Sequence, residues 1–152
     1  MAKPDSVMYI AMNEAVAIVR QRNREWAVDL QMIGTQPQCL AVDSQRPQQV
    51  YCGTFDQGLW RSENAGDSWE HVEAGIEQQS VTSVAVSLTE RAGDYGVVYA
   101  GTEPSTLYRS EDGGRQHVAE ACRTAPVYAR GNHVTPEADS ERDAPISTRN
   151  LD

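Results

Sequence analysis

The sequence predicts an all-β fold built from a repeated unit of short strands, and three observations support this prediction. Residues 50–54 (VYCGT) are echoed by residues 98–102 (VYAGT), 48 positions further along the 152-residue chain. At the same offset, residues 59–64 (LWRSEN) are echoed by residues 107–112 (LYRSED). No segment shows a convincing period of 3.6 residues, so the repeat is best explained by strands.

Apolar runs rich in β-branched or aromatic residues, each bounded by turn-forming residues, predict the strands of the two clear units. In the first unit we expect strands at 39–43, 49–54, 58–62 and 69–73. In the second unit we expect strands at 82–88, 97–102, 106–110 and 117–120. The second unit carries four extra residues within 90–96, and because insertions belong in loops, we expect a turn there.

A fainter copy of the unit precedes these two. Three of its positions align with the next unit: Tyr9 to Ala11 with Tyr51 to Gly53, Val16 with Leu59, and Trp26 with Trp69. Residues 15–24 fit a helix and a buried strand equally well. We expect about two and a half units in all.

Four short strands in a unit of about 45 residues are typical of a β-propeller blade. The predicted fold is therefore a partial β-propeller of about two and a half four-stranded antiparallel blades. A propeller needs about four blades to close. We therefore expect either a truncated or frameshifted propeller, or a chain that self-associates through its open blade edges.

The repeat pattern stops at His117. Residues 118–152 contain three of the seven prolines and scattered charges, so burial cannot offset the entropy lost on ordering them. The expected organisation is an N-terminal extension at 1–6, repeat blades at 7–117 (about 7–32, 38–75 and 81–117), and a disordered tail at 118–152.

Residues 62–69 (SENAGDSW) fit the pattern Ser/Thr-x-Asp/Asn-x-Gly-x-Ser/Thr-Trp, and residues 110–117 (SEDGGRQH) fit its first half. In such a turn the Asn or Asp can accept hydrogen bonds from the backbone, and the Gly can adopt a positive φ. The Trp fills apolar volume beneath the turn. The residues given this structural role are Ser62, Asn64, Gly66, Ser68, Trp69, Ser110, Asp112 and Gly114. A calcium or ligand role for Asn64 or Asp112 is the alternative.

With these motifs, residues 7–117 resemble the BNR/Asp-box repeat superfamily of β-propellers, and especially bacterial WD40/YVTN/BNR-like repeat proteins. The superfamily includes sialidases, sortilin-type receptors, xyloglucan-cleaving glycosidases and photosystem II assembly factors. The resemblance implies that the Asp-box is structural and lies opposite any active site. The Phe-Arg-Ile-Pro segment of sialidases is absent, because the one phenylalanine, Phe55, is followed by Asp56.

Glycoside hydrolysis needs two carboxylates held about 5–10 Å apart. One acidic residue per unit lies in the loop after the Gly-Thr strand or its counterpart: Glu14, Asp56 and Glu103. In a propeller these loops would share one rim, so the three carboxylates could face a common site. Solvated turns of an acidic protein carry such residues too. We therefore assign no catalytic residue and keep these three as candidates.

Composition and net charge limit the classes of partner and cofactor that we expect. The net charge of -9 and the pI near 4.7 disfavour binding to phosphate backbones. Cys39, Cys52 and Cys122 show no metal-binding spacing and no disulfide framework, so we expect neither a metal nor a cofactor. No apolar run resembles a membrane span or a secretory segment, which leads us to expect a cytoplasmic protein.

Three interpretations stay open. The first is a non-catalytic scaffold that binds a protein or a glycan on a propeller face. The second is a glycoside hydrolase of the sialidase-like or xyloglucanase-like type, and a partly folded remnant is a third possibility. The absent sialidase segment and the small number of blades favour the scaffold over the enzyme.

Overall fold

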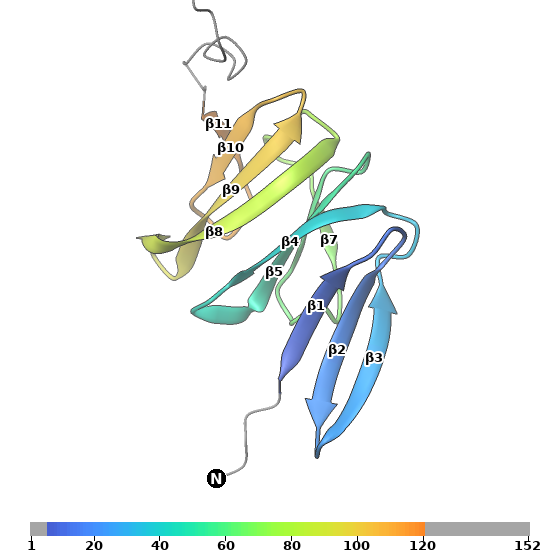
Figure 1. The fold of residues 1–152 in the computed structure, drawn as a ribbon. Coiled ribbons are helices and arrows are strands. Elements are labelled where there is room, and N and C mark those ends of the chain that lie inside the picture. The colour runs from blue at the N-terminus through green and yellow to red at the C-terminus, as the bar shows by residue number, and fades with distance from the viewer. Residues whose placement is uncertain (1–5, 121–152) are drawn as a thin grey trace, which may run out of the picture.

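The computed structural model describes residues 6–120, and all regular elements in this span are β-strands (Figure 1). Sheet 1 contains β1 (Val7–Ala11), β2 (Val16–Arg22) and β3 (Glu25–Gln31). Sheet 2 contains β4 (Pro37–Asp43), β5 (Arg46–Thr54), β6 (Leu59–Ser62) and β7 (Glu70–Val72). Sheet 3 contains β8 (Ser80–Ala92), β9 (Tyr95–Glu103), β10 (Leu107–Ser110) and β11 (Val118–Glu120).

Each sheet is an antiparallel meander, as the repeat predicted. The tail expected to be disordered lies, from residue 121 on, outside the described residues. Within the described span, no helix is long and apolar enough to cross a membrane.

The fainter copy forms sheet 1, and its strands occupy the same places as those of the clear copies. The equivalent cross-strand pairs are Ala11 with Val16 in sheet 1, Gly53 with Leu59 in sheet 2, and Gly101 with Leu107 in sheet 3. Residues 16–22 are therefore a strand and not a helix. Among the described residues, sheet 1 has three strands and no counterpart of β4 or β8.

The turn between β2 and β3 also distinguishes sheet 1. Asn23 and Arg24 both have positive φ, at 50° and 69°, which is the backbone of a two-residue hairpin turn. This tight turn replaces the eight-residue motif of the other two sheets. Trp26, which aligns with Trp69 in sequence, therefore lies on β3 with 55% of its surface exposed.

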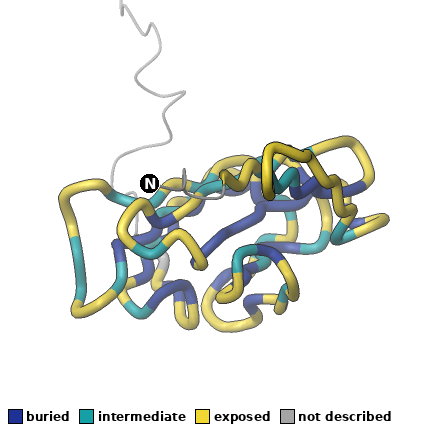
Figure 2. Tube along the Cα trace, turned by 90° about the horizontal axis from the view of Figure 1, so that it is seen from below, coloured by how far each residue is buried: buried dark blue, intermediate teal, exposed yellow. Residues whose placement is uncertain are grey.

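Two apolar clusters hold the sheets face to face, with sheet 2 in the middle. The cluster between sheets 1 and 2 is centred on Val16, Ile18 and Cys52, with Tyr9, Met32, Leu40, Trp60 and Trp69 packed around it. The cluster between sheets 2 and 3 contains Tyr51, Leu59, Val72, Ile76, Val81, Val98, Ala100 and Tyr108. In Figure 2 the buried stretches run through the interior of the trace, and exposed stretches form much of its outline.

Two details differ from the sequence prediction. The insertion expected to form a turn at 90–96 is mostly strand, and the extra residues produce a register shift between Val86 and Arg91. The Ser87 hydroxyl accepts a hydrogen bond from the Glu90 nitrogen at 2.9 Å, so a local bend within β8 absorbs the insertion. The strand expected at 117–120 is present as β11 and pairs with β10, so sheet 3 continues past the blade boundary expected at 117.

Candidate functional site

The loops that follow β1, β5 and β9 form one edge of the molecule, which we call the rim. β1 and β9 both run toward the upper end of Figure 1. Backbone hydrogen bonds join neighbouring loops there. The Gly34 nitrogen donates to the Glu14 carbonyl at 2.7 Å, and the Phe55 nitrogen donates to the Gln36 carbonyl at 3.0 Å.

The three candidate carboxylates lie on these loops. Glu14 follows β1, Asp56 follows β5, and Glu103 ends β9, and all three residues are exposed. Across residues 6–120, the structure shows no hydrogen bond or ion pair made by their side chains. In the same span, no group of three or more His, Cys, Asp or Glu side chains could hold a metal ion. The fold therefore brings these residues to one rim but into no shared cluster.

The 62–69 turn lies at the other end of sheet 2 and is closed by its own side chains. The Ser62 hydroxyl accepts a hydrogen bond from the Gly66 nitrogen at 2.8 Å. The Asn64 side chain accepts one from the Ser68 nitrogen at 2.9 Å and donates one to the Ser68 hydroxyl at 2.8 Å. These bonds use the side chains of Ser62, Asn64 and Ser68 within the turn.

The 110–117 turn of sheet 3 uses the same design. The Ser110 hydroxyl accepts from the Gly114 nitrogen at 3.0 Å, and the Asp112 carboxylate accepts from the Arg115 and Gln116 nitrogens, both at 2.9 Å. Burial alone would raise the pKa of Asp112, but these backbone bonds and a bond from Ser110 hold it below its usual value. Because backbone nitrogens are the donors, Gln116 closes the turn although the pattern asks for Ser or Thr there.

Each turn also packs onto the preceding sheet through its glycine. Gly66 has a φ of +85°, and a Cβ placed there would lie 2.4 Å from Cδ1 of Ile18 in sheet 1. Gly114 has a φ of +80°, and a Cβ there would lie 2.6 Å from Cε1 of Tyr51 in sheet 2. Only glycine combines this backbone conformation with such a close approach.

The residues at the ends of the two motifs, Trp69 and His117, are packed between sheets. Trp69 lies against the Val16–Ile18–Cys52 cluster. His117 is 4% exposed, and neither of its ring nitrogens has a hydrogen-bond partner in the described part of the chain. Burial lowers the pKa of His117 to about 4. Its imidazole is therefore neutral and fills the place of a packing ring.

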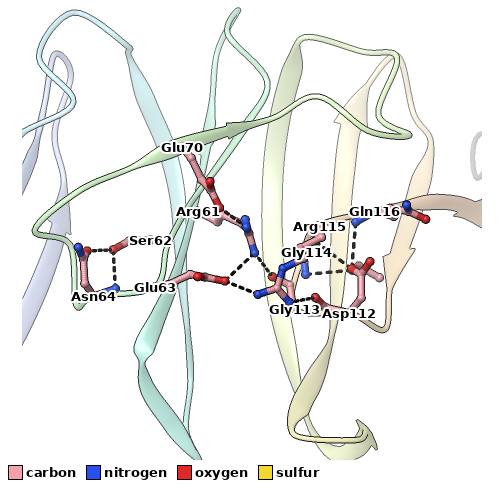
Figure 3. Close-up of polar contacts among 11 residues, drawn as sticks. Arg61, Ser62, Glu63, Asn64, Glu70, Asp112, Gly113, Gly114, Arg115 and Gln116 are labelled. Carbon is pink, nitrogen blue, oxygen red and sulfur yellow. Dashed lines mark hydrogen bonds and ion pairs between the residues drawn. The ribbon is translucent and has the colours of Figure 1, made fainter.

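A charged cluster joins the two turns, and the sequence prediction missed it. The Arg61 side chain is 11% exposed; it forms ion pairs with Glu63 and Glu70 and donates to the Gly113 carbonyl in sheet 3 at 3.3 Å (Figure 3). Arg115 of sheet 3 reaches Glu63 at 2.7 Å. With its charges paired, the cluster links two sheets and holds no free nucleophile or acid.

The repeat itself carried a signal for this cluster. The Arg-Ser-Glu sequence at 61–63 recurs at 109–111, and Arg109 pairs with Glu111 as Arg61 pairs with Glu63. A recurring arginine on a strand next to the motif predicts a repeated ion pair. What the repeat could not predict is that Arg115, outside the common pattern, adds a link between sheets.

Comparisons with known proteins place this arrangement among solved folds. No protein-family model and no curated protein matches the sequence. The GH74 xyloglucanase of Xanthomonas campestris superposes with a TM-score of 0.54 at 24% identity, over 72% of this chain and 20% of that one. The GH74 enzyme of Niastella koreensis gives a TM-score of 0.50 at 22% identity, over 70% of this chain and 18% of that one. Both are β-propellers.

The chain is a partial β-propeller. A third structure, YCF48 bound to D1 peptide, superposes with a TM-score of 0.48 at 10% identity, over 78% of this chain and 42% of that one, so the fold assignment rests on the first two. The chain spans about one fifth of the two GH74 enzymes. At these identities the likeness concerns the fold.

As blades of a propeller, the two outer sheets each have one face that no other strand of residues 6–120 covers. On sheet 1 the cross-strand pairs place alternate residues of all three strands on that face. The large apolar side chains there are Met8 (51% exposed), Ile10 (41%), Trp26 (55%), Val28 (63%) and Leu30 (48%). We call this surface the free face of sheet 1.

Proposed function

We propose that the chain is a non-catalytic propeller scaffold that binds its partner, a protein or a glycan, through the free face of sheet 1. The observation that carries the proposal is the row of exposed apolar side chains on that face, which includes Trp26 and Val28. Large contiguous apolar patches on soluble proteins are usually interaction sites. The net charge of -9 supports a partner other than a nucleic acid.

The chemistry of the rim supports a role without catalysis. A glycoside hydrolase holds an acid and a base or nucleophile at a defined separation around the scissile bond. Here Glu14, Asp56 and Glu103 are exposed residues on separate loops. Arg61, the most buried cation of the charged cluster, is committed to Glu63 and Glu70.

The proposal is tested by two measurements on the purified chain. Incubation with xyloglucan or a fluorogenic sialoside should release no more product than a buffer blank. At protein concentrations low enough for the chain to be monomeric, Nile red, an uncharged dye that fluoresces on apolar surfaces, should bind, and its signal should fall in Val28→Lys but not in Ile33→Lys. Ile33 is a matched control because it is 73% exposed and lies in a turn.

The alternative is a glycoside hydrolase, favoured by the position of three carboxylates on one rim and by the fold shared with two GH74 enzymes. It predicts xyloglucan turnover that is lost in Asp56→Asn or Glu103→Gln. That result would overturn the scaffold proposal. Turnover that persists in both variants would indicate a contaminating enzyme.

A further inference from the structure

The molecule makes the same contact between sheets twice. Between sheets 1 and 2, Gly66 of the second sheet lies against Ile18 and Tyr9 of the first. Between sheets 2 and 3, Gly114 of the third sheet lies against Tyr51 of the second. Tyr9 and Tyr51 occupy the same place in their sheets. Each sheet therefore offers one kind of face to the sheet before it and another kind to the sheet after it.

The face turned toward the preceding sheet is identified by a cross-strand pair. Cys52 pairs with Trp60 on the side of sheet 2 that meets sheet 1. Ala100 pairs with Tyr108 on the side of sheet 3 that meets sheet 2. The equivalent pair in sheet 1 begins with Ile10, on the free face of sheet 1. Cys52 and Ala100 are 0% exposed, whereas Ile10 is 41% exposed, because none of the described sheets covers it.

Sheets 2 and 3 also differ in the exposure of the face that each turns toward a following sheet. Leu59 of sheet 2 is 0% exposed because sheet 3 covers it. Leu107, its counterpart in sheet 3, is 39% exposed, and Val118 on the same side is 69% exposed. We call this side of β8 to β11, with Tyr99 at its centre, the free face of sheet 3. It corresponds to the face that sheet 2 turns toward sheet 3, and no strand within residues 6–120 covers it.

Charge does not oppose a contact between the two free faces. The positions that form the free face of sheet 1 are uncharged on all three strands. On the free face of sheet 3, the Tyr99 hydroxyl donates to Glu90 at 2.6 Å and accepts from Arg109 at 3.3 Å. The Arg109 guanidinium also pairs with Glu111 at 2.5 Å, so two carboxylates and one guanidinium lie around Tyr99 and would meet an uncharged face on sheet 1.

We infer that a second copy of this chain binds head to tail, with its free face of sheet 3 against the free face of sheet 1. This inference rests on the proposed binding role and names the partner. The contact repeats the strand-face packing that the chain already makes twice, without the glycine turn, because Asn23 and Arg24 form a tight turn in sheet 1. It removes apolar side chains from water on both sides. Head-to-tail contacts close into rings when the rotation allows. Two copies supply about six blades, within the range of closed propellers, so the expected assembly is a dimer.

Sedimentation velocity at micromolar to 100 µM protein (on the order of the concentrations used for weak dimers) tests the inference. The unchanged chain should sediment as a dimer. Val28→Lys on one face and Leu107→Lys on the other should each weaken dimerisation at least about tenfold, because each buries a charge in the contact. Ile33→Lys should leave the dimer unchanged. Circular dichroism shows whether each variant keeps its β-sheet content, and Trp26→Glu replaces Val28→Lys if that variant unfolds.

Mixing the two variants gives the sharper result. Val28→Lys keeps an intact free face of sheet 3, and Leu107→Lys keeps an intact free face of sheet 1. Each alone should be monomeric, and an equimolar mixture should form dimers. A dimer that survives Leu107→Lys would show that two copies meet through the same face and would overturn the head-to-tail contact. A monomer at all concentrations would overturn the inference, while dye binding without hydrolysis would leave the scaffold proposal standing.

Discussion

The backbone nitrogen of Gly96 in sheet 3 donates a hydrogen bond of 2.9 Å to the Asp43 carboxylate in sheet 2. Asp43 is 1% exposed and also accepts a bond from the Gln45 nitrogen at 3.0 Å. Burial alone would raise the pKa of Asp43, but these two bonds and the nearby Arg91 guanidinium hold it below its usual value. The buried carboxylate therefore remains ionised and links two sheets.

Asp43→Ala should lower the free energy of unfolding by about 3 kcal/mol, because it leaves the Gly96 nitrogen without its charged partner. Urea denaturation at pH 7 measures the loss. Asp56→Ala, at an exposed residue, should change stability by less than about 0.5 kcal/mol. Since the folded pKa of Asp43 is lowered, its contribution is complete above the unfolded value near 3.9 and is lost as the pH falls through the folded value.

His117 should make the fold sensitive to mild acid. The pKa of His117 is about 4 in the folded chain. Between pH 6.5 and pH 4, His117 therefore binds a proton in the unfolded chain but not in the folded chain. Stability is therefore full above pH 6.5 and declines by up to about 3 kcal/mol as the pH falls toward 4. Arg61 favours the neutral ring, and Asp112 opposes this effect.

Denaturation midpoints between pH 7 and pH 4.5 check the contribution of His117. His117→Phe keeps a ring in the pocket and should flatten the decline. His71→Phe, at an exposed position, should leave the decline in place. If both variants show the decline of the unchanged chain, another group causes it.

A comparison of Gly66 with Gly34, a glycine between β3 and β4, separates the backbone effect of a substitution from its packing effect. Gly66→Ala and Gly34→Ala both place an alanine at nearly the same positive φ, which is +85° at Gly66 and +84° at Gly34. A Cβ at Gly34 meets no atom within 4 Å, whereas one at Gly66 meets Ile18. We expect about 1 kcal/mol of destabilisation for Gly34→Ala and at least about 1 kcal/mol more for Gly66→Ala.

A double-mutant cycle tests this explanation. Ile18→Ala removes the atom that the new methyl group would strike, so it should recover part of the additional loss in Gly66→Ala. Thermal melts of the two single variants and the double variant measure the coupling. Strict additivity would mean that the turn does not press on sheet 1.

Trp69→Ala should lower the free energy of unfolding by about 3 kcal/mol, because the ring packs against the cluster between sheets 1 and 2. Trp26→Ala is the matched control, since that ring is 55% exposed on the free face of sheet 1. It should change stability by less than about 1 kcal/mol. Equal losses would show that Trp69 is not a core residue.

The strands could be predicted because the same strand pattern occurs in more than one copy of the repeat. The alignment of Val16 with Leu59 located β2 correctly, since both residues pair across equivalent hairpins. The burial of Trp26 could not be inferred from its alignment with Trp69, because burial depends on the turn that precedes the ring. The insertion near 90 was misplaced because a bulge within a strand and a longer loop add the same number of residues.

Less of the candidate site could be predicted from the sequence. Residue spacing put Glu14, Asp56 and Glu103 on equivalent loops, but side-chain separation depends on how neighbouring sheets splay. The free faces arise because sheets 1 and 3 are the outer sheets of the described array, and each has a neighbouring sheet on one side. Only the register shows that Ile10 and Leu107 hold positions that are buried in the middle sheet.

The middle position of sheet 2 has a consequence for folding cooperativity. Tyr51 belongs to one apolar cluster and Cys52 to the other, so adjacent residues of β5 connect the two halves of the interior. In such a linear array, stability is passed between nearest neighbours, and the ends fray first. Backbone amides of β5 should therefore exchange with solvent most slowly, and those of β3 should exchange early. A destabilising substitution in β5 would uncouple the flanking sheets, whereas unfolding of either outer sheet would leave one interface intact.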